Sequence, residues 1–162
     1  MEHPSILIKP TDEEWALFDD IIATQRLPRT TTIKEFLYDE LFYEYYKNAW
    51  EQAYVEYTKS ELSVPLDASL NNVFLSEKAR TQFENETEEF RLLFVGWMQS
   101  QLENQMTPYF SGQRVDKNRD QWIYSFGKIK VLASIRKQKV TILAFDKTTN
   151  EELLRKMLEE EV

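Results

Sequence analysis

Three consecutive runs of β-prone residues lie in the second half of the chain, and they constrain its fold more than any other feature. The runs are 122–126, 129–135 and 140–145. Gly127 and Lys128 separate the first pair, and the four polar residues 136–139 separate the second pair. Connections this short join neighbouring antiparallel strands. The sequence therefore predicts an antiparallel β-meander.

Helical patterns surround this meander. A short strand over 73–75 leads to Ser76, which is placed to cap a helix that continues through Phe83. A polar break near Thr87 precedes a strongly apolar helix over 90–102, and residues 151–160 form a last helix with one apolar side. We therefore expect the second half to be a compact α+β domain.

The first half predicts a strand, a helix, a turn and a second helix. Residues 5–9 are β-prone and stop at Pro10, and Thr11 followed by three acidic residues is typical of a helix N-cap. The pattern breaks at 26–29, and the threonines at 30–32 can cap the next helix.

An aromatic stripe marks the continuation of this second helix. Its members, spaced three or four residues apart, are Tyr46, Trp50, Tyr54 and Tyr57. The helix leads into residues 63–67, which are expected to be a linker, so it has few local partners for this stripe. The stripe is therefore expected to be an interface with another domain or another chain.

Charge is distributed unevenly along the chain. Residues 1–72 contain 6 Lys and Arg against 14 Asp and Glu, whereas residues 73–162 contain 14 of each. The net charge of −8 therefore belongs to the first half. Such an acidic segment is either an internal electrostatic partner for a nucleic-acid-like surface or an ordinary solvated acidic helix.

Several function classes are excluded by residues that the chain lacks. Without cysteine it has no disulfides, thiolate zinc sites or thiol nucleophiles, and the lone His3 cannot build a site of several imidazoles. No run approaches the roughly 18–20 apolar residues that span a bilayer, and residues 1–4 lack the basic start of a secretory signal. We therefore expect a cytoplasmic protein with no membrane partner, no cofactor and no metal.

The order of elements resembles a ribbon-helix-helix antitoxin of the RelB type followed by a RelE/ParE-like toxin. The antitoxin-like motifs are residues 6–14, 30–35, 43–46 and 49–54. The toxin-like motifs are residues 74–83, 122–124, 127–132 and 140–143. The two resemblances together extend over most of the chain.

The resemblance implies a fusion of two proteins that are usually separate. Residues 1–62 would be a ribbon-helix-helix antitoxin-like region with an extended helix, residues 63–72 a linker, and residues 73–162 a RelE/ParE-like domain. That domain would consist of two helices packed on a small antiparallel sheet, plus a C-terminal helix. In the family an acidic antitoxin segment wraps a basic toxin, and the toxin cleaves messenger RNA on the ribosome or, in the ParE branch, poisons gyrase.

Metal-free RNA cleavage needs a proton acceptor, a proton donor and cations that hold the reacting phosphate. The candidate catalytic residues are Tyr124, Lys128, Lys130 and Lys147. The candidate RNA-binding residues are Arg114, Lys117, Arg119 and Arg136. Lys130 stands where the family has an arginine, which has a bidentate fork that lysine lacks, and the closing His-Arg and Tyr motif is absent. These departures favour an inactive or self-neutralised domain over an active ribonuclease.

The N-terminal strand carries the candidate DNA-binding face. Ser5, Leu7 and Lys9 share one side of it, which in a ribbon-helix-helix dimer would enter the major groove. Leucine cannot donate to a base edge and the neighbouring acids repel phosphate. Two alternatives therefore stand equally: the strand binds operator DNA, or it forms a homodimerisation ribbon that does not bind DNA.

These observations lead to one expected function with two alternatives. We expect a toxin–antitoxin-like regulatory protein, homodimeric through its N-terminal strands, with operator DNA and RNA or the ribosome as possible partners, and not an enzyme. One alternative is an active messenger-RNA endoribonuclease inhibited by its own N-terminal half. The other is a decoy that binds another toxin or antitoxin.

Overall fold

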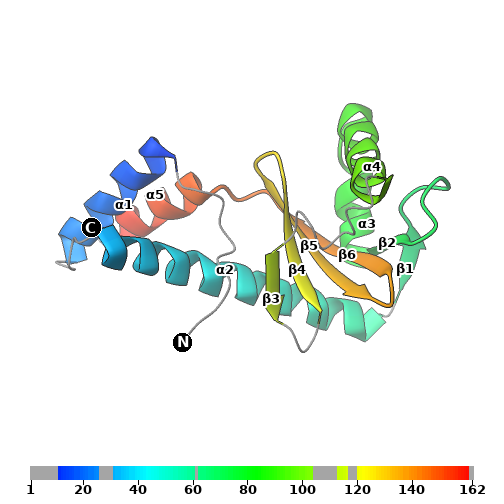
Figure 1. Cartoon of the computed structure of the whole chain (residues 1–162), viewed down its shortest axis with the longest axis horizontal. Helices are drawn as coiled ribbons and strands as arrows, with labels where there is room; N and C mark the ends of the chain where they lie inside the picture. Colours follow the sequence, from blue (N-terminus) through cyan, green and yellow to red (C-terminus); the bar gives the residue numbers. More distant parts are fainter. Residues whose placement is uncertain (1–10, 26–30, 61, 104–112, 117–119, 161–162) are drawn as a thin grey trace. The chain divides into compact units, whose positions relative to one another are not determined.

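The computed structural model describes residues 11–25, 31–60, 62–103, 113–116 and 120–160 (Figure 1). Over these residues the chain is α+β, as expected. The helices are α1 (Asp12–Gln25), α2 (Thr31–Ser60), α3 (Glu77–Glu84), α4 (Glu88–Glu103) and α5 (Asn150–Glu160). The strands are β1 (Ser63–Pro65), β2 (Val73–Ser76), β3 (Gln113–Asp116), β4 (Gln121–Phe126), β5 (Ile129–Arg136) and β6 (Lys139–Asp146).

The chain divides into two compact units, which we call the sheet unit and the helical unit. The sheet unit comprises the described residues between 47 and 147, and the helical unit comprises those between 11 and 46 and between 148 and 160. The boundary falls inside α2, so this division differs from the 1–62 and 73–162 expected from the sequence. Helix α5 belongs with the N-terminal helices because its apolar side packs against α1.

Residues 63–72, expected to be a linker, are part of the sheet unit. Ser63–Pro65 forms β1, an edge strand antiparallel to β2. Leu66 and Leu70 are buried in the core below the sheet edge. The proline and polar residues of this segment predict a linker, but the burial of its two leucines holds it against the rest of the sheet unit.

The sheet has six strands in the order β1-β2-β6-β5-β4-β3. The predicted meander is confirmed, because β4 pairs antiparallel with β5 and β5 pairs antiparallel with β6. However, β2 pairs parallel with β6, so the sheet is mixed rather than antiparallel. Parallel strands need a long connection, and the chain between β2 and β6 contains α3, α4, β3, β4 and β5.

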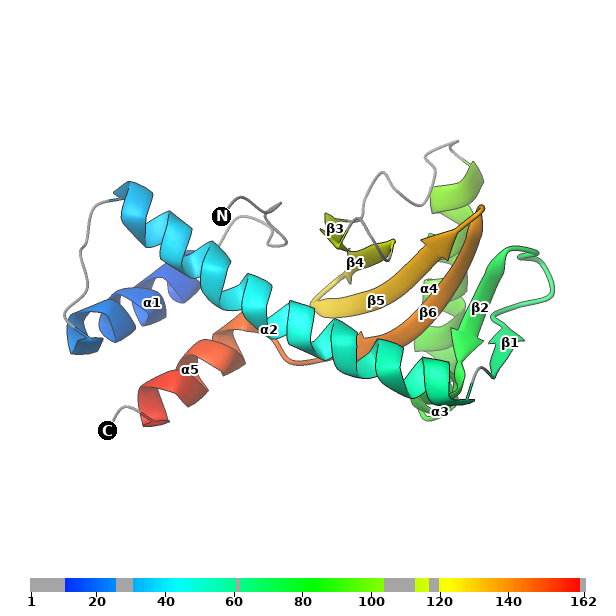
Figure 2. The same cartoon turned by 90° about the horizontal axis from the view of Figure 1, so that it is seen from below.

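The two faces of the sheet are covered by different helices (Figure 2). On one face, α3 and α4 contribute Phe83 and Phe94 to a core with Tyr124, Val131 and Ile135. On the other face, which we call the α2 face, the second half of α2 lies against β4 and β5. Side chains alternate along each strand, so neighbouring residues serve the two faces in turn.

Ser76 fixes the passage from β2 into α3. Its side chain accepts a hydrogen bond from the backbone N–H of Ala79 at 3.2 Å, which is the predicted N-cap. The same hydroxyl donates to the carbonyl of Leu143 in β6 at 2.8 Å. One buried residue therefore joins a helix cap to the parallel strand pair.

The helical unit has an aromatic core of its own. The rings of Trp15 and Phe18 in α1 contact Tyr38, which also contacts Phe42 in α2. The Tyr38 hydroxyl donates to Glu14 at 2.8 Å. Burial, together with this carboxylate neighbour, raises the pKa of Tyr38 well above the usual value for tyrosine.

None of the described helices is both long enough and apolar enough to cross a membrane.

Candidate functional site

Trp50 is the centre of the contact between α2 and the sheet within the sheet unit. Its side chain is 0% exposed, and its indole Nε1 donates to the carbonyl of Ala133 in β5 at 3.1 Å. The ring also stacks on Tyr54 with centroids 4.7 Å apart. Ala53, one residue before Tyr54, is buried too. The aromatic stripe thus packs, in part, on the sheet of its own chain.

Polar contacts flank this aromatic centre. Gln121 Nε2 in β4 donates to Glu51 at 3.3 Å, and Arg136 at the end of β5 donates to the Tyr54 hydroxyl at 3.2 Å. Further along α2, Glu56 forms an ion pair with Lys78 of α3 at 3.1 Å. The second half of α2 therefore brings both an apolar surface and two carboxylates to the sheet unit.

The four residues of the stripe do not form one surface. Trp50 and Tyr54 lie on the sheet, whereas Tyr46 belongs to the helical unit, where its hydroxyl donates to Asn150 at 3.0 Å. Tyr57 lines a separate pocket near the end of α2.

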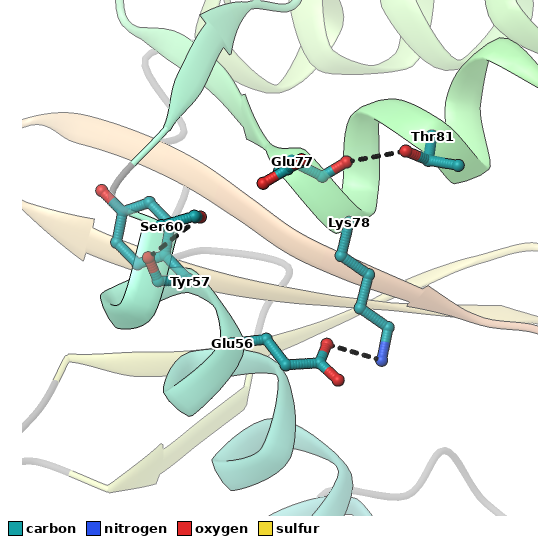
Figure 3. Close-up of a pocket in the computed structure, with 6 residues that line it drawn as sticks. All are labelled: Glu56, Tyr57, Ser60, Glu77, Lys78 and Thr81. Atoms are coloured by element: carbon teal, nitrogen blue, oxygen red, sulfur yellow. Dashed lines mark hydrogen bonds and ion pairs between the residues drawn. The ribbon is translucent and has the colours of Figure 1, made fainter.

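This pocket, shown in Figure 3, has a volume of about 220 Å³. Its lining residues are Glu56, Tyr57, Ser60, Glu77, Lys78 and Thr81. The dashed contacts in the figure join Glu56 to Lys78, the Thr81 hydroxyl to the backbone carbonyl of Glu77, and the Ser60 hydroxyl to the backbone carbonyl of Tyr57. Its one lysine is therefore already paired with a carboxylate.

Lys130, a candidate catalytic residue, is only 7% exposed. Its Nζ donates to the hydroxyl of Ser125 at 2.8 Å, and its cross-strand neighbour in β6 is Asp146. This lysine is therefore held within the sheet by a hydrogen bond instead of being presented to solvent. To hold a phosphate, Lys130 would have to leave this arrangement.

The other candidate catalytic residues do not converge on Lys130. Tyr124 pairs in register with Val131, so its ring lies on the opposite face of the sheet, where it contacts Trp97. Lys147 forms an ion pair with Glu86 beyond the end of β6. Lys128 is exposed in the turn between β4 and β5.

The predicted nucleic-acid contacts are only partly described by the structure. Arg136 is exposed at the end of β5. Arg114 lies in β3, but its side chain, together with Lys117 and Arg119, is outside the described part of the structure. Residues 5–9, with the DNA-binding candidates Ser5, Leu7 and Lys9, also lie outside it, so the dimerisation ribbon stays a prediction.

Sequence reasoning missed two polar residues of the α2 face. Gln121 is 0% exposed and contacts Glu51, and Ser125 is the partner of Lys130. Their sequence signal was the alternation along β4, which places both on the face opposite Tyr124. Starting the strand at 122 left Gln121 out of that pattern.

Neither a metal centre nor a known relative identifies the site. Among the described residues, no group of three or more His, Cys, Asp and Glu side chains is placed to bind a metal ion. Comparison of the chain with protein-family models, with curated proteins and with solved structures found no match.

Proposed function

We propose that this protein is a toxin–antitoxin-like binding and regulatory protein. An antitoxin-like segment from its acidic half, the second half of α2, covers a RelE-like domain in the same chain. The RelE-like domain is inactive or self-neutralised.

The observation that supports the cover most strongly is the burial of Trp50 on the sheet. Its indole N–H replaces solvent at the Ala133 carbonyl, and its ring fills the α2 face. Glu51 and Glu56 then reach Gln121 and Lys78. This combination of an aromatic anchor with acidic flanks is what a segment that neutralises a more basic domain requires.

The arrangement of the candidate catalytic residues supports the inactive state. Lys130 is buried against Ser125, Tyr124 is on the other face, and Lys147 is paired with Glu86. Metal-free cleavage needs these groups to surround one phosphate. Their separation across both faces and one end of the sheet does not provide such a site.

If the second half of α2 covers the sheet, a separate peptide with the same sequence should bind there when the contact made by the chain's own α2 is weakened. We expect a labelled peptide of residues 47–60 to bind the full chain that carries Trp50→Ala, because the variant leaves an incompletely filled α2 face. The unaltered chain should not bind the peptide, since its own α2 occupies that face. Fluorescence anisotropy of the peptide measures both cases.

The matched control for this experiment is Val55→Ala on the same helix. Val55 is 45% exposed, so its replacement leaves the cover in place and no peptide binding is expected. Circular dichroism checks that each variant retains its helices. Equal peptide binding by the control, or none by a folded Trp50→Ala chain, would contradict the cover.

Growth on induction tests whether the domain is inactive. We expect bacteria that produce the full chain, or its Trp50→Ala form, to grow at the rate of cells with an empty vector, because the candidate catalytic groups do not converge. Optical density over time is the measurement. Arrest by the Trp50→Ala chain that disappears when Lys130→Ala is added would instead establish an active ribonuclease inhibited in cis.

A further inference from the structure

The turn between β5 and β6 carries an exposed cluster of cations, which we call the basic tip. It consists of Arg136, Lys137, Gln138 and Lys139, and all four are exposed. The tip lies where β5 and β6 meet at one end of the sheet (Figure 2). Three of its four residues are cationic in a chain whose net charge is −8.

The backbone of the tip is strained in a way that its sequence does not relieve. Lys137 has φ of 48° and Gln138 has φ of 68°, both in the left-handed region. Two-residue hairpins with this geometry favour Asn-Gly, because glycine and asparagine adopt the left-handed conformation at a lower cost than other residues. The turn between β4 and β5, by contrast, places Gly127 at φ of 62°. Turn stability therefore does not account for the choice of Lys-Gln.

The cations of the basic tip differ from other cations in the sheet unit in having no ion-pair partner among the described residues. Lys78, Arg80 and Lys147 form ion pairs with Glu56, Glu84 and Glu86 respectively. Across the residues that the structure describes, no carboxylate forms an ion pair with the three cations of the tip. Their positive charge is thus directed to solvent.

Two of the tip cations are oriented by aromatic side chains. Arg136 donates to the Tyr54 hydroxyl at 3.2 Å, and Lys139 Nζ lies 4.6 Å from the ring centroid of Phe74. Both aromatic residues are only partly buried. These contacts fix the side chains and leave their charges intact.

We propose that the basic tip binds the phosphodiester backbone of a single-stranded nucleic acid. Closely spaced, oriented cations match successive phosphates, and partly exposed rings beside them offer stacking surfaces for bases. The acidic helices of a second copy are the less suitable partner. Of their carboxylates, Glu14 accepts a hydrogen bond from Tyr38 and Asp19 is paired with Lys34 within the same chain. The tip is exposed while α2 is in place, and the contact of Arg136 with Tyr54 requires that helix to stay there.

Binding of short, labelled single-stranded RNA and DNA to the full chain tests this proposal by fluorescence anisotropy. Three phosphate contacts predict a salt slope of about −2, so the affinity should fall about 20-fold between about 50 and about 200 mM salt. The backbone charge is common to both nucleic acids. If the chain binds one of the two with higher affinity, that nucleic acid is assigned as the partner.

Two double variants with the same change in net charge, one at the tip and one elsewhere, test whether the nucleic acid binds at the tip. Lys137→Glu/Lys139→Glu should abolish most of the salt-dependent binding. Lys59→Glu/Lys156→Glu, which changes two exposed lysines elsewhere in the chain, should preserve the slope. Gln138→Gly, which relieves one strained position and keeps every cation, should also preserve it.

The same experiment has clear contrary outcomes. Absence of binding by the parent chain at low salt overturns the proposal, as does an equal loss of binding in both double variants. Light scattering in the same buffers provides a further check. If the parent chain self-associates in a salt-sensitive way and only the tip variant abolishes this, the partner of the tip is a second copy of the chain and not a nucleic acid. These results do not depend on peptide binding or growth, so they test the tip separately from the proposed function.

Discussion

Replacing Trp50 with alanine is expected to lower the free energy of unfolding of the sheet unit by about 3–5 kcal/mol. The side chain is 0% exposed, so its removal leaves a cavity between α2 and the sheet. The substitution also removes the indole donor of the Ala133 carbonyl and the stacking partner of Tyr54. Urea denaturation followed by far-ultraviolet circular dichroism measures the loss.

Val55→Ala is the control for this effect, because it shortens a side chain on the same helix. A 45% exposed residue should change the free energy of unfolding by no more than about 0.5 kcal/mol. If both variants cost the same, the helix contributes to stability through its backbone alone. Trp50 would then not be the anchor of the contact.

Phe94→Ala should produce a loss of similar size, about 3–5 kcal/mol, on the opposite face of the sheet. Phe94 is 0% exposed. Its ring contacts five other aromatic rings, those of Phe83, Phe90, Trp97, Phe126 and Phe145. Alanine would leave a large void among rigid rings, which cannot collapse to fill it. The midpoint of thermal unfolding should fall accordingly.

Leu93→Ala is the matched control, one residue away on α4. Leu93 is 60% exposed, so most of its surface is already in contact with water. Its replacement should cost no more than about 0.5 kcal/mol. A large effect at Leu93 with a small effect at Phe94 would mean that α4 packs through its other side.

The sequence by itself determined the elements that depend on local physical chemistry. Alternation and short turns predicted β4, β5 and β6, and the Ser76 cap predicted the start of α3. The aromatic stripe predicted that α2 buries one side. Each of these features is set by residues within a few positions of one another.

The tertiary structure alone decided which distant segments meet. Val73 pairs with Val140 in a parallel register, and Trp50 reaches Ala133, because these surfaces complement each other once the chain has folded. Lys130 became a buried partner of Ser125 rather than an exposed cation, since its strand face is covered. Periodicity shows that a face is apolar, but its partner depends on the shape and polar groups of every other face, which no local pattern contains.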